Sequence, residues 1–224
     1  MSRRKATIVQ GVGAHSDPWH GLESTSAAIV AVLSDEHDCT IVTTDDRLDL
    51  TDTDLVVVNV SGEFETKPGD SEPVVDELVR YSRCGGAILA CHSSALGFTD
   101  DPRWEALMGG VWVTGVTMHP QIGWSLVQMS DDSPLAPAVS DFELYDERYS
   151  HLRVSDDNHI LASHTEDGMT HPLAWLRPAS HVAGPVIYTA LGHGVEAYES
   201  VGHQRFLRSA VDWLAHNAQR EGKR

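Results

Sequence analysis

Short hydrophobic runs separated by polar loops make up the first half of the chain. Four of them have strand length: Ala6–Val12, Cys39–Thr43, Asp54–Val60 and the run that begins at Ala87. Asp54–Val60 is almost entirely hydrophobic, which is typical of a strand covered on both faces. Glu23 to about Asp35 and Pro73–Ser82 have helical periodicity instead. Helices that alternate with hydrophobic strands predict a parallel sheet with right-handed crossover connections.

The second half of the chain has a different pattern. Val111–Met129 reads as a β excursion, and we expect a small β insertion near residues 110–150. Three short strands and an amphipathic helix then follow: Ile160–Ser163, Leu173–Leu176, Val186–Leu191 and Gln204 to about His216. The whole pattern predicts one three-layer α/β domain over residues 6–216, with a mostly parallel, doubly wound sheet. Residues 1–5 are expected to be disordered, and residues 217–224 form a polar tail.

Composition narrows the range of partners and the compartment. The 224 residues carry a formal net charge of −17, which argues against nucleic acid and anionic membranes as partners. The basic N-terminus lacks the long hydrophobic region of a signal peptide, and no run is long enough to span a membrane. Three scattered cysteines suit a reducing compartment. We therefore expect an acidic, cytoplasmic protein.

The stretch Gly85–Phe98 has the pattern of a strand, a sharp turn and a helix. Its hydrophobic run ends at Cys91-His92-Ser93-Ser94, and such an elbow projects one side chain above the carboxyl edge of a parallel sheet. The crowded turn favours small residues two positions before and after its apex. An apex at His92 or Ser93 meets this condition, whereas Cys91 would place Leu89 two positions before it. His92 is the favoured apex, with Cys91 facing the core; a buried strand with an ordinary polar end is the alternative.

Histidines stand where several strands are expected to end. Of the thirteen in the chain, five follow strands or begin loops: His20, His92, His119, His171 and His193. The carboxyl ends of parallel strands converge on one crevice, where several imidazoles can share protons or bind a metal ion. A shared site at this edge is therefore expected.

Four sequence motifs resemble those of the ThuA-like (trehalose utilisation) proteins, which belong to the class I glutamine-amidotransferase-like superfamily. They are Gly85-Gly86 with His92-Ser93, then His119-Pro120, then Asp146-Glu147-Arg148-Tyr149, and finally His171-Pro172-Leu173-Ala174-Trp175 with Val186–His193 and Val211-Asp212-Trp213. Their order and spacing extend over roughly residues 6–215. The resemblance implies a flavodoxin-like sheet and, because this fold often dimerises, a homodimer.

The resemblance also implies a function in disaccharide use, on a small-molecule sugar. ThuA-like proteins resemble partners of dehydrogenases that oxidise a sugar at C3, and would act on the 3-keto sugar or its glycoside. Acid/base elimination–hydrolysis or isomerisation needs a base, an acid and a group that polarises the ketone. His92 and His193 are the expected base and acid, Glu147 could orient a histidine or act as the base, and Tyr149 could donate to the oxyanion.

Further residues are expected to contact the substrate: Trp19, His20, Ser93, His119 and His171. His20, His119 and Glu147 could instead bind zinc or another divalent ion, which would polarise the ketone. No cofactor is required by the motifs, and no tight metal-binding spacing is present.

Two other functions remain open at this stage. The chain could be a non-catalytic module that binds a sugar or a protein on the same fold. It could also be an amidase if Cys91, rather than His92, occupied the apex. A histidine apex argues against a glutamine amidotransferase, which uses a cysteine there.

Overall fold

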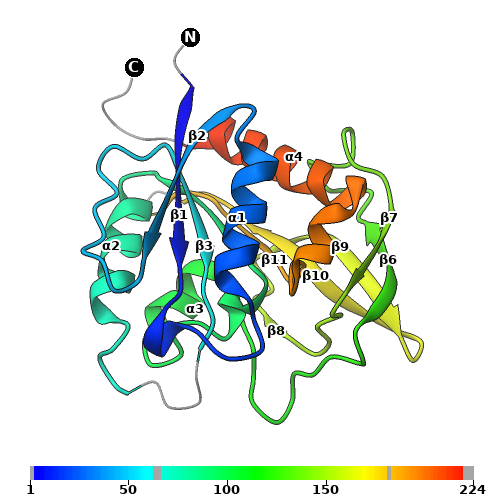
Figure 1. Cartoon of the computed structure of the whole chain (residues 1–224). Coiled ribbons are helices and arrows are strands. Elements are labelled where there is room, and N and C mark those ends of the chain that lie inside the picture. The colour runs from blue at the N-terminus through cyan, green and yellow to red at the C-terminus, as the bar shows by residue number, and fades with distance from the viewer. Residues whose placement is uncertain (1–2, 63–66, 181–182, 219–224) are drawn as a thin grey trace.

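Nine strands form one continuous sheet in the computed structural model, which describes residues 3–62, 67–180 and 183–218 (Figure 1). Their order across the sheet is β2-β1-β3-β4-β11-β10-β9-β6-β7. These strands are β1 (Arg4–Gln10), β2 (His37–Thr43), β3 (Leu55–Asn59), β4 (Ala87–Cys91), β6 (Gly123–Met129), β7 (Phe142–Asp146), β9 (His159–Glu166), β10 (Met169–Arg177) and β11 (Val186–Thr189). A separate two-stranded sheet pairs β5 (Gly110–Val111) with β8 (Arg153–Val154).

The strands from β2 to β11 in this order are parallel, and those from β11 to β7 are antiparallel. Four antiparallel steps lead from β11 to β7, so β7 again runs in the same direction as β4 and β11. Its carboxyl end therefore lies at the same edge of the sheet as theirs. This direction brings residues from both halves of the sheet to one site.

Burial along the strands follows their place in the sheet. Every residue of β3 and β4 is buried, as expected for central strands covered on both faces. Along β7, and over the middle of β6, buried and exposed residues alternate, so one face of this hairpin meets solvent. β6 pairs with β7 at five positions but with β9 at only two. The β6–β7 hairpin is thus joined to the rest of the sheet over a short length.

Helices cover both faces of the sheet. In Figure 1, α1 (Leu22–Leu33) and α4 (Val201–Asn217) lie in front of it and contact each other. On the other side, α2 (Glu72–Arg83) contacts α3 (Pro102–Met108). Three short 3-10 helices are η1 (Gly13–His15), η2 (His92–Ala95) and η3 (Val195–Glu199). The three-layer, doubly wound α/β fold predicted from the sequence is confirmed.

Three details differ from the prediction. The β insertion is larger than expected, because β6 and β7 extend the main sheet and only β5 and β8 stand apart from it. Helix α3 was not predicted, although Asp101 caps its first turn by accepting from the amide of Arg103, and Gly109 ends it with a φ of 79°.

The ends of the domain also differ slightly. Arg4 and Lys5 pair with β2 and so belong to the first strand rather than to a disordered leader, and Asn217 belongs to α4. Residues 1–2 and 219–224, for which disorder or a tail was expected, lie outside the described residues. None of the helices in the described part of the chain has both the length and the hydropathy of a membrane-spanning helix.

Candidate functional site

His92 occupies the apex of the elbow at the end of β4. Its φ of 40° lies in the left-handed region, which is uncommon for a residue other than glycine. The hydroxyl of Tyr188 donates to the His92 carbonyl oxygen at 2.8 Å, and Ser94 donates to the carbonyl of Val58 at 2.9 Å. The buried strands on both sides thus hold the turn in place.

Cys91 is the last residue of β4 and lies in the core. Its side chain is 1% exposed, and burial raises the pKa of the thiol to about 12. A thiol of this kind is neither ionised near neutral pH nor accessible to a substrate. An amidase that depends on Cys91 is therefore incompatible with the structure.

The imidazole of His92 has a fixed orientation. Its Nδ1 lies 2.6 Å from the carbonyl oxygen of Ala190, which can only accept, so Nδ1 carries the proton. Nε2 then accepts from the hydroxyl of Tyr149 at 2.9 Å. Burial lowers the pKa of His92 to about 4, so the ring is neutral near pH 7.

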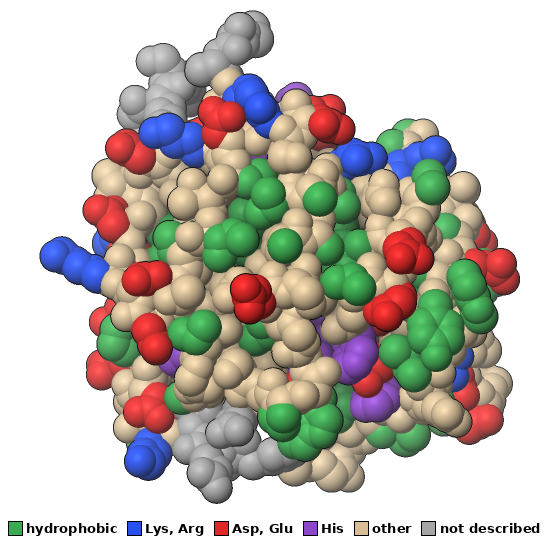
Figure 2. Space-filling model, viewed as in Figure 1, with side chains coloured by type: hydrophobic (Ala, Val, Ile, Leu, Met, Phe, Trp, Pro, Cys, Tyr) green, Lys and Arg blue, Asp and Glu red, His purple; other side chains and the backbone are tan. Residues whose placement is uncertain are grey.

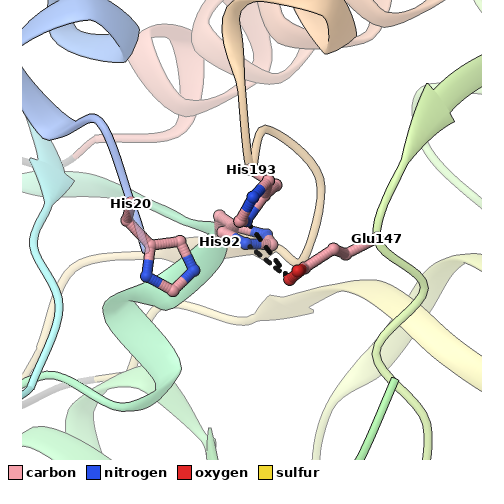
Figure 3. A group of neighbouring side chains, drawn as sticks. All are labelled: His20, His92, Glu147 and His193. Atoms are coloured by element: carbon pink, nitrogen blue, oxygen red, sulfur yellow. Dashed lines mark ion pairs between the residues drawn. The ribbon is translucent and has the colours of Figure 1, made fainter. Parts of the chain in front are cut away.

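Four side chains converge above the carboxyl edge of the sheet (Figure 3): His20, His92, Glu147 and His193. Each comes after a different strand: His20 after β1, His92 after β4, Glu147 after β7 and His193 after β11. One ligand-type atom from each lies within 4.8 Å of every other. The structure brings three of the strand-end histidines together, and the shared direction of β7 adds Glu147 to them.

Glu147 lies at the centre of this histidine–glutamate cluster. Its carboxylate is 3.5 Å from Nε2 of His92, 3.3 Å from Nδ1 of His193 and 3.6 Å from Nε2 of His119. Burial opposes ionisation of Glu147, but the neighbouring His193 outweighs it and holds the pKa of Glu147 well below the ordinary range. The same carboxylate raises the pKa of His193. The cluster thus combines a carboxylate anion, its partner His193 and the neutral ring of His92.

Asp17 orients the ring of His20. Its carboxylate oxygens lie 2.7 and 2.9 Å from Nδ1 of His20, and it also accepts from the hydroxyl of Ser61. Nδ1 of His20 therefore donates, and Nε2 is directed towards the other cluster residues. Although burial disfavours the charged form, these hydrogen bonds lower the pKa of Asp17 to about 2. Sequence reasoning missed this partner, although an Asp three residues before a strand-end His was a usable signal.

Asp146 ties the end of β7 to the loop that follows β11. It is 1% exposed and accepts from the backbone amides of Gly192, His193 and Glu147 at 2.7, 3.0 and 2.9 Å. Burial raises the pKa of Asp146 to about 7, against the three amides that favour its charged form. Through these bonds one side chain fixes the relative positions of Glu147 and His193.

The cluster opens to solvent beside His119. The His119 side chain is 39% exposed, whereas that of His92 is 2% exposed. Trp112 and Tyr149 pack edge to face, with ring centroids 4.8 Å apart, and His119 lies about 6 Å from each ring. Figure 2 shows a group of histidine side chains at the surface, right of centre, next to acidic and hydrophobic side chains. A small molecule could reach the cluster from this opening.

Several predicted site residues have other environments. Ser93 is buried and donates to the carbonyl of Val60, so its hydroxyl links the elbow to β3 rather than facing a substrate. His171 is buried on β10 beside His151 and His164, with ring centroids 4.5 and 5.3 Å away, and is not part of the cluster. The sequence placed both near a strand end but could not give the direction of either side chain.

The expected metal-binding set is brought together only in part. His20 and Glu147 belong to the cluster, but His119 lies at its rim, and His92 and His193 complete the group instead.

Trp19 is 62% exposed on the loop that carries His20. Trp124 is 72% exposed on β6, where it contacts Tyr145 rather than the cluster.

A parallel α/β sheet whose elbow presents a polar apex at its carboxyl edge defines the class I glutamine-amidotransferase-like fold, here with histidine in the place of the cysteine. The chain belongs to the ThuA family, described as trehalose utilisation, whose sequence profile matches residues 5–214. Among curated proteins, none matches the chain in sequence.

Solved structures share this fold at low sequence identity. A ThuA-like protein from Parabacteroides merdae has a TM-score of 0.79 at 17% identity, with 96% of this chain and 90% of that chain covered. A ThuA-like protein from Bacteroides uniformis has a TM-score of 0.72 at 18% identity, covering 95% and 92%. PurLQS from Thermotoga maritima has a TM-score of 0.58 at 17% identity, covering 95% and 100%. At these identities the likeness concerns the fold.

Proposed function

We propose that this protein is an enzyme of carbohydrate utilisation that moves a proton next to the carbonyl group of a keto-sugar. The observation that carries the proposal is the convergence of three imidazoles, one carboxylate and the Tyr149 hydroxyl at a single opening. Membership of the trehalose-utilisation family supports a sugar as the substrate class. The three cysteines are free, which fits the cytoplasm as the place of action.

The chemistry follows from the acidity of a carbon next to a ketone. In a 3-keto glycoside, a base removes the proton from C2, and the electron pair of that bond forms an enolate with its charge on the C3 oxygen. If the C1–oxygen bond then breaks, the leaving oxygen takes a proton and an unsaturated ketone remains, to which water can add. If C3 takes a proton instead, and the proton of the C2 hydroxyl passes to the C3 oxygen, the product is the 2-keto isomer. Both outcomes need one stabilised oxyanion and one group that shuttles the proton.

The residues divide between these two tasks. Tyr149 and His193 are the groups suited to stabilise the oxyanion, because the Tyr149 hydroxyl is a hydrogen-bond donor and Glu147 raises the pKa of His193, which favours its protonated, donating form. His119 is suited to proton transfer, because its ring is partly exposed and can exchange protons with water. The Tyr149 hydroxyl, which donates to Nε2 of His92 at 2.9 Å, can donate to the developing oxyanion instead.

The test is hydrogen exchange at C2 of a keto-sugar. The 3-keto derivative of trehalose is incubated with the protein in D2O, and deuterium incorporation and product formation are followed by NMR. Catalysed exchange at C2 that falls by about 10²- to 10⁴-fold in His119→Gln is the expected result. His159→Gln is a matched control, since His159 is exposed on β9 and is not a member of the cluster.

The opposite result is equally defined. Saturable binding of the keto-sugar with no exchange and no product would refute the enzyme and support a non-catalytic binding module. Exchange that continues unchanged in His119→Gln would refute the role given to this residue.

A further inference from the structure

We propose that His20, His92, Glu147 and His193 bind one divalent first-row transition-metal ion per chain, with Zn²⁺ as the reference ion. Three imidazole nitrogens and one carboxylate oxygen form a donor set that suits Zn²⁺ and its neighbours in the series. Binding is inferred from the geometry alone. The role given to the ion, polarisation of the ketone, rests on the proposed function.

The spacing of the donors is close to that of a tetrahedral site. Bonds of about 2.1 Å at tetrahedral angles place neighbouring donor atoms about 3.4 Å apart. Glu147 already lies 3.5 Å from Nε2 of His92 and 3.3 Å from Nδ1 of His193. All four donors lie within 4.8 Å of one another, so side-chain rotations without a change of backbone can complete the site.

Two of the donor nitrogens are buried without a hydrogen bond. Nε2 of His20 has no hydrogen-bond partner among the described residues, and Nδ1 of His193 faces the Glu147 carboxylate at 3.3 Å without the geometry of a hydrogen bond; both nitrogens are shielded from solvent. The His20 side chain as a whole is only 10% exposed. A buried polar atom without a partner costs free energy, and a metal ion at the centre of the cluster would remove that cost for both nitrogens.

Two further groups hold the imidazoles in the form that binds a metal. The Asp17 carboxylate accepts the Nδ1 proton of His20 at 2.7 Å, and the Ala190 carbonyl accepts that of His92 at 2.6 Å. Each leaves Nε2 with its lone pair directed to the cluster. Metal-binding histidines commonly donate their other ring N–H to a carboxylate or a backbone carbonyl in this way.

The hydrogen bond from Tyr149 to His92 changes when the ion binds. The Nε2 lone pair that accepts the Tyr149 hydroxyl at 2.9 Å would go to the metal, which frees that hydroxyl to donate to another oxygen next to the ion. The side of the cluster facing His119 remains open to a fifth donor. A ketone oxygen bound there would meet both the ion and Tyr149, and the ion would act as a Lewis acid.

The test is direct metal binding to the full-length protein. The protein is freed of metal with a chelator and titrated with Zn²⁺ by calorimetry and with Co²⁺ by visible absorption. We expect about one ion per chain, and a loss of affinity in His20→Gln and Glu147→Gln that exceeds the ~10–100-fold typical of a change in an outer partner. Asp17→Asn keeps all four donors and should weaken binding by ~10–100-fold. His159→Gln should bind like the wild type.

Unchanged stoichiometry and affinity in both ligand variants would overturn the proposal. If a ligand variant fails to fold by circular dichroism, Asp17→Asn and the thermal shift that Zn²⁺ causes in the wild type still decide it. Tight binding without C2 exchange, in the presence or absence of Zn²⁺, would support the metal site and refute the proposed function. Full exchange in the metal-free protein would refute the role of the ion as the group that polarises the ketone.

Discussion

The chemistry of each residue in the cluster depends on its surroundings and not only on its residue type. His92 and His193 are both imidazoles at strand ends, yet burial lowers the pKa of the first and Glu147 raises that of the second. The neutral ring of His92 is fixed by the Ala190 carbonyl and Tyr149, which makes it a poor base. In place of the predicted base–acid pair of His92 and His193, we therefore propose a shared cluster with His119 as the proton carrier.

Tyr149→Phe should separate catalysis from metal binding. The change removes only the hydroxyl that donates to His92, so we expect C2 exchange to fall by about 10²-fold or more, while Zn²⁺ affinity stays within a few-fold of the wild type. NMR measures the rate of C2 exchange, and calorimetry measures the affinity for Zn²⁺. Tyr145→Phe, on the exposed side of β7, is the control. Unchanged exchange in Tyr149→Phe would rule out the hydroxyl as an oxyanion donor.

The left-handed backbone of His92 predicts which replacements the elbow tolerates. Asn adopts positive φ more readily than other non-glycine residues, whereas Val is β-branched and strongly disfavoured at a φ of 40°. We therefore expect His92→Asn to be more stable than His92→Val by about 1–3 kcal/mol in urea denaturation. Equal stability of the two variants would mean that the backbone strain at this turn has little energetic weight.

At the scale of elements, the β6–β7 hairpin brings Glu147 to a site that otherwise belongs to the parallel strands. Four antiparallel steps separate β7 from β11, yet Asp146 joins the two strand ends directly. This link explains how a segment that was predicted to be only a small insertion supplies two residues of the site.

Asp146→Ala should loosen this link. Two buried amides and one part-buried amide would lose their acceptor, and an unsatisfied buried N–H costs about 1–3 kcal/mol. We expect the free energy of unfolding to fall by at least about 3 kcal/mol, measured by urea denaturation, with Zn²⁺ affinity falling in parallel. Asp141→Ala is a milder comparison, because Asp141 accepts from one amide near the surface, that of Met129. A loss no larger than that of Asp141→Ala would contradict the proposed link.

His203, in the first turn of α4, should make the fold sensitive to acid. It is fully buried, its Nδ1 donates to the carbonyl of Ala197, and burial lowers its pKa from 6.5 to about 4. Because the unfolded chain takes up this proton first, the stability that the neutral ring provides is present above pH 6.5 and is lost as the pH falls towards 4. The loss amounts to about 3 kcal/mol, or about 1.4 kcal/mol per pH unit.

His203→Asn is the variant that tests this prediction. Asn can still donate to Ala197 but does not titrate, so the slope of unfolding free energy against pH between 6.5 and 4 should be smaller by about 1.4 kcal/mol per unit. Urea denaturation at several pH values measures both slopes. Other buried histidines, such as His15 and His37, titrate equally in both proteins. Identical slopes would show that the ring of His203 is not held neutral.

The sequence predicted the elements of this fold better than their directions. Hydrophobic runs located β1 to β4 and the turn at His92; the signal is clearest for β3 and β4, which are buried throughout. Helix α3 was missed because its seven residues are too few for a clear helical period, although Asp101-Pro102 marks its start. No local pattern could show that β7 runs parallel to β4, since that depends on the pairing of four other strands.

At the scale of the whole molecule, the sequence likewise predicted which residues lie near strand ends, but not which side chains meet at the site. Strand-end position grouped His20, His92 and His193, which the structure brings together, but the partners that orient His20 and His92, namely Asp17 and the Ala190 carbonyl, depend on tertiary contacts. His171 shared the sequence signal, but it lies within β10 opposite His164 of β9 and packs against His151 and His164 rather than against the cluster. The position of a residue along a strand could be predicted, whereas the direction of its strand could not.

The charge of the whole chain predicts how it responds to salt. With 33 acidic and 16 basic side chains, like charges repel one another across the folded surface. Salt screens this repulsion, so we expect the melting temperature to rise between about 0.02 M and about 0.5 M NaCl. Differential scanning calorimetry measures the melting temperature, and a melting temperature that stays constant or falls with salt would contradict the prediction.

Sedimentation in the same salt series tests the expected homodimer, because screening also favours association of like-charged copies.

The cluster draws one residue from each of four strand ends that are far apart in sequence. No fragment or half-formed sheet can hold all four, so the donors come together only once β1, β4, β7 and β11 are all in place. During refolding from urea, the absorption of bound Co²⁺ should therefore appear in the last kinetic phase, after helical circular dichroism has recovered. An ion that binds only the completed fold also slows its unfolding, so the same cluster would determine how long the native protein survives under denaturing conditions.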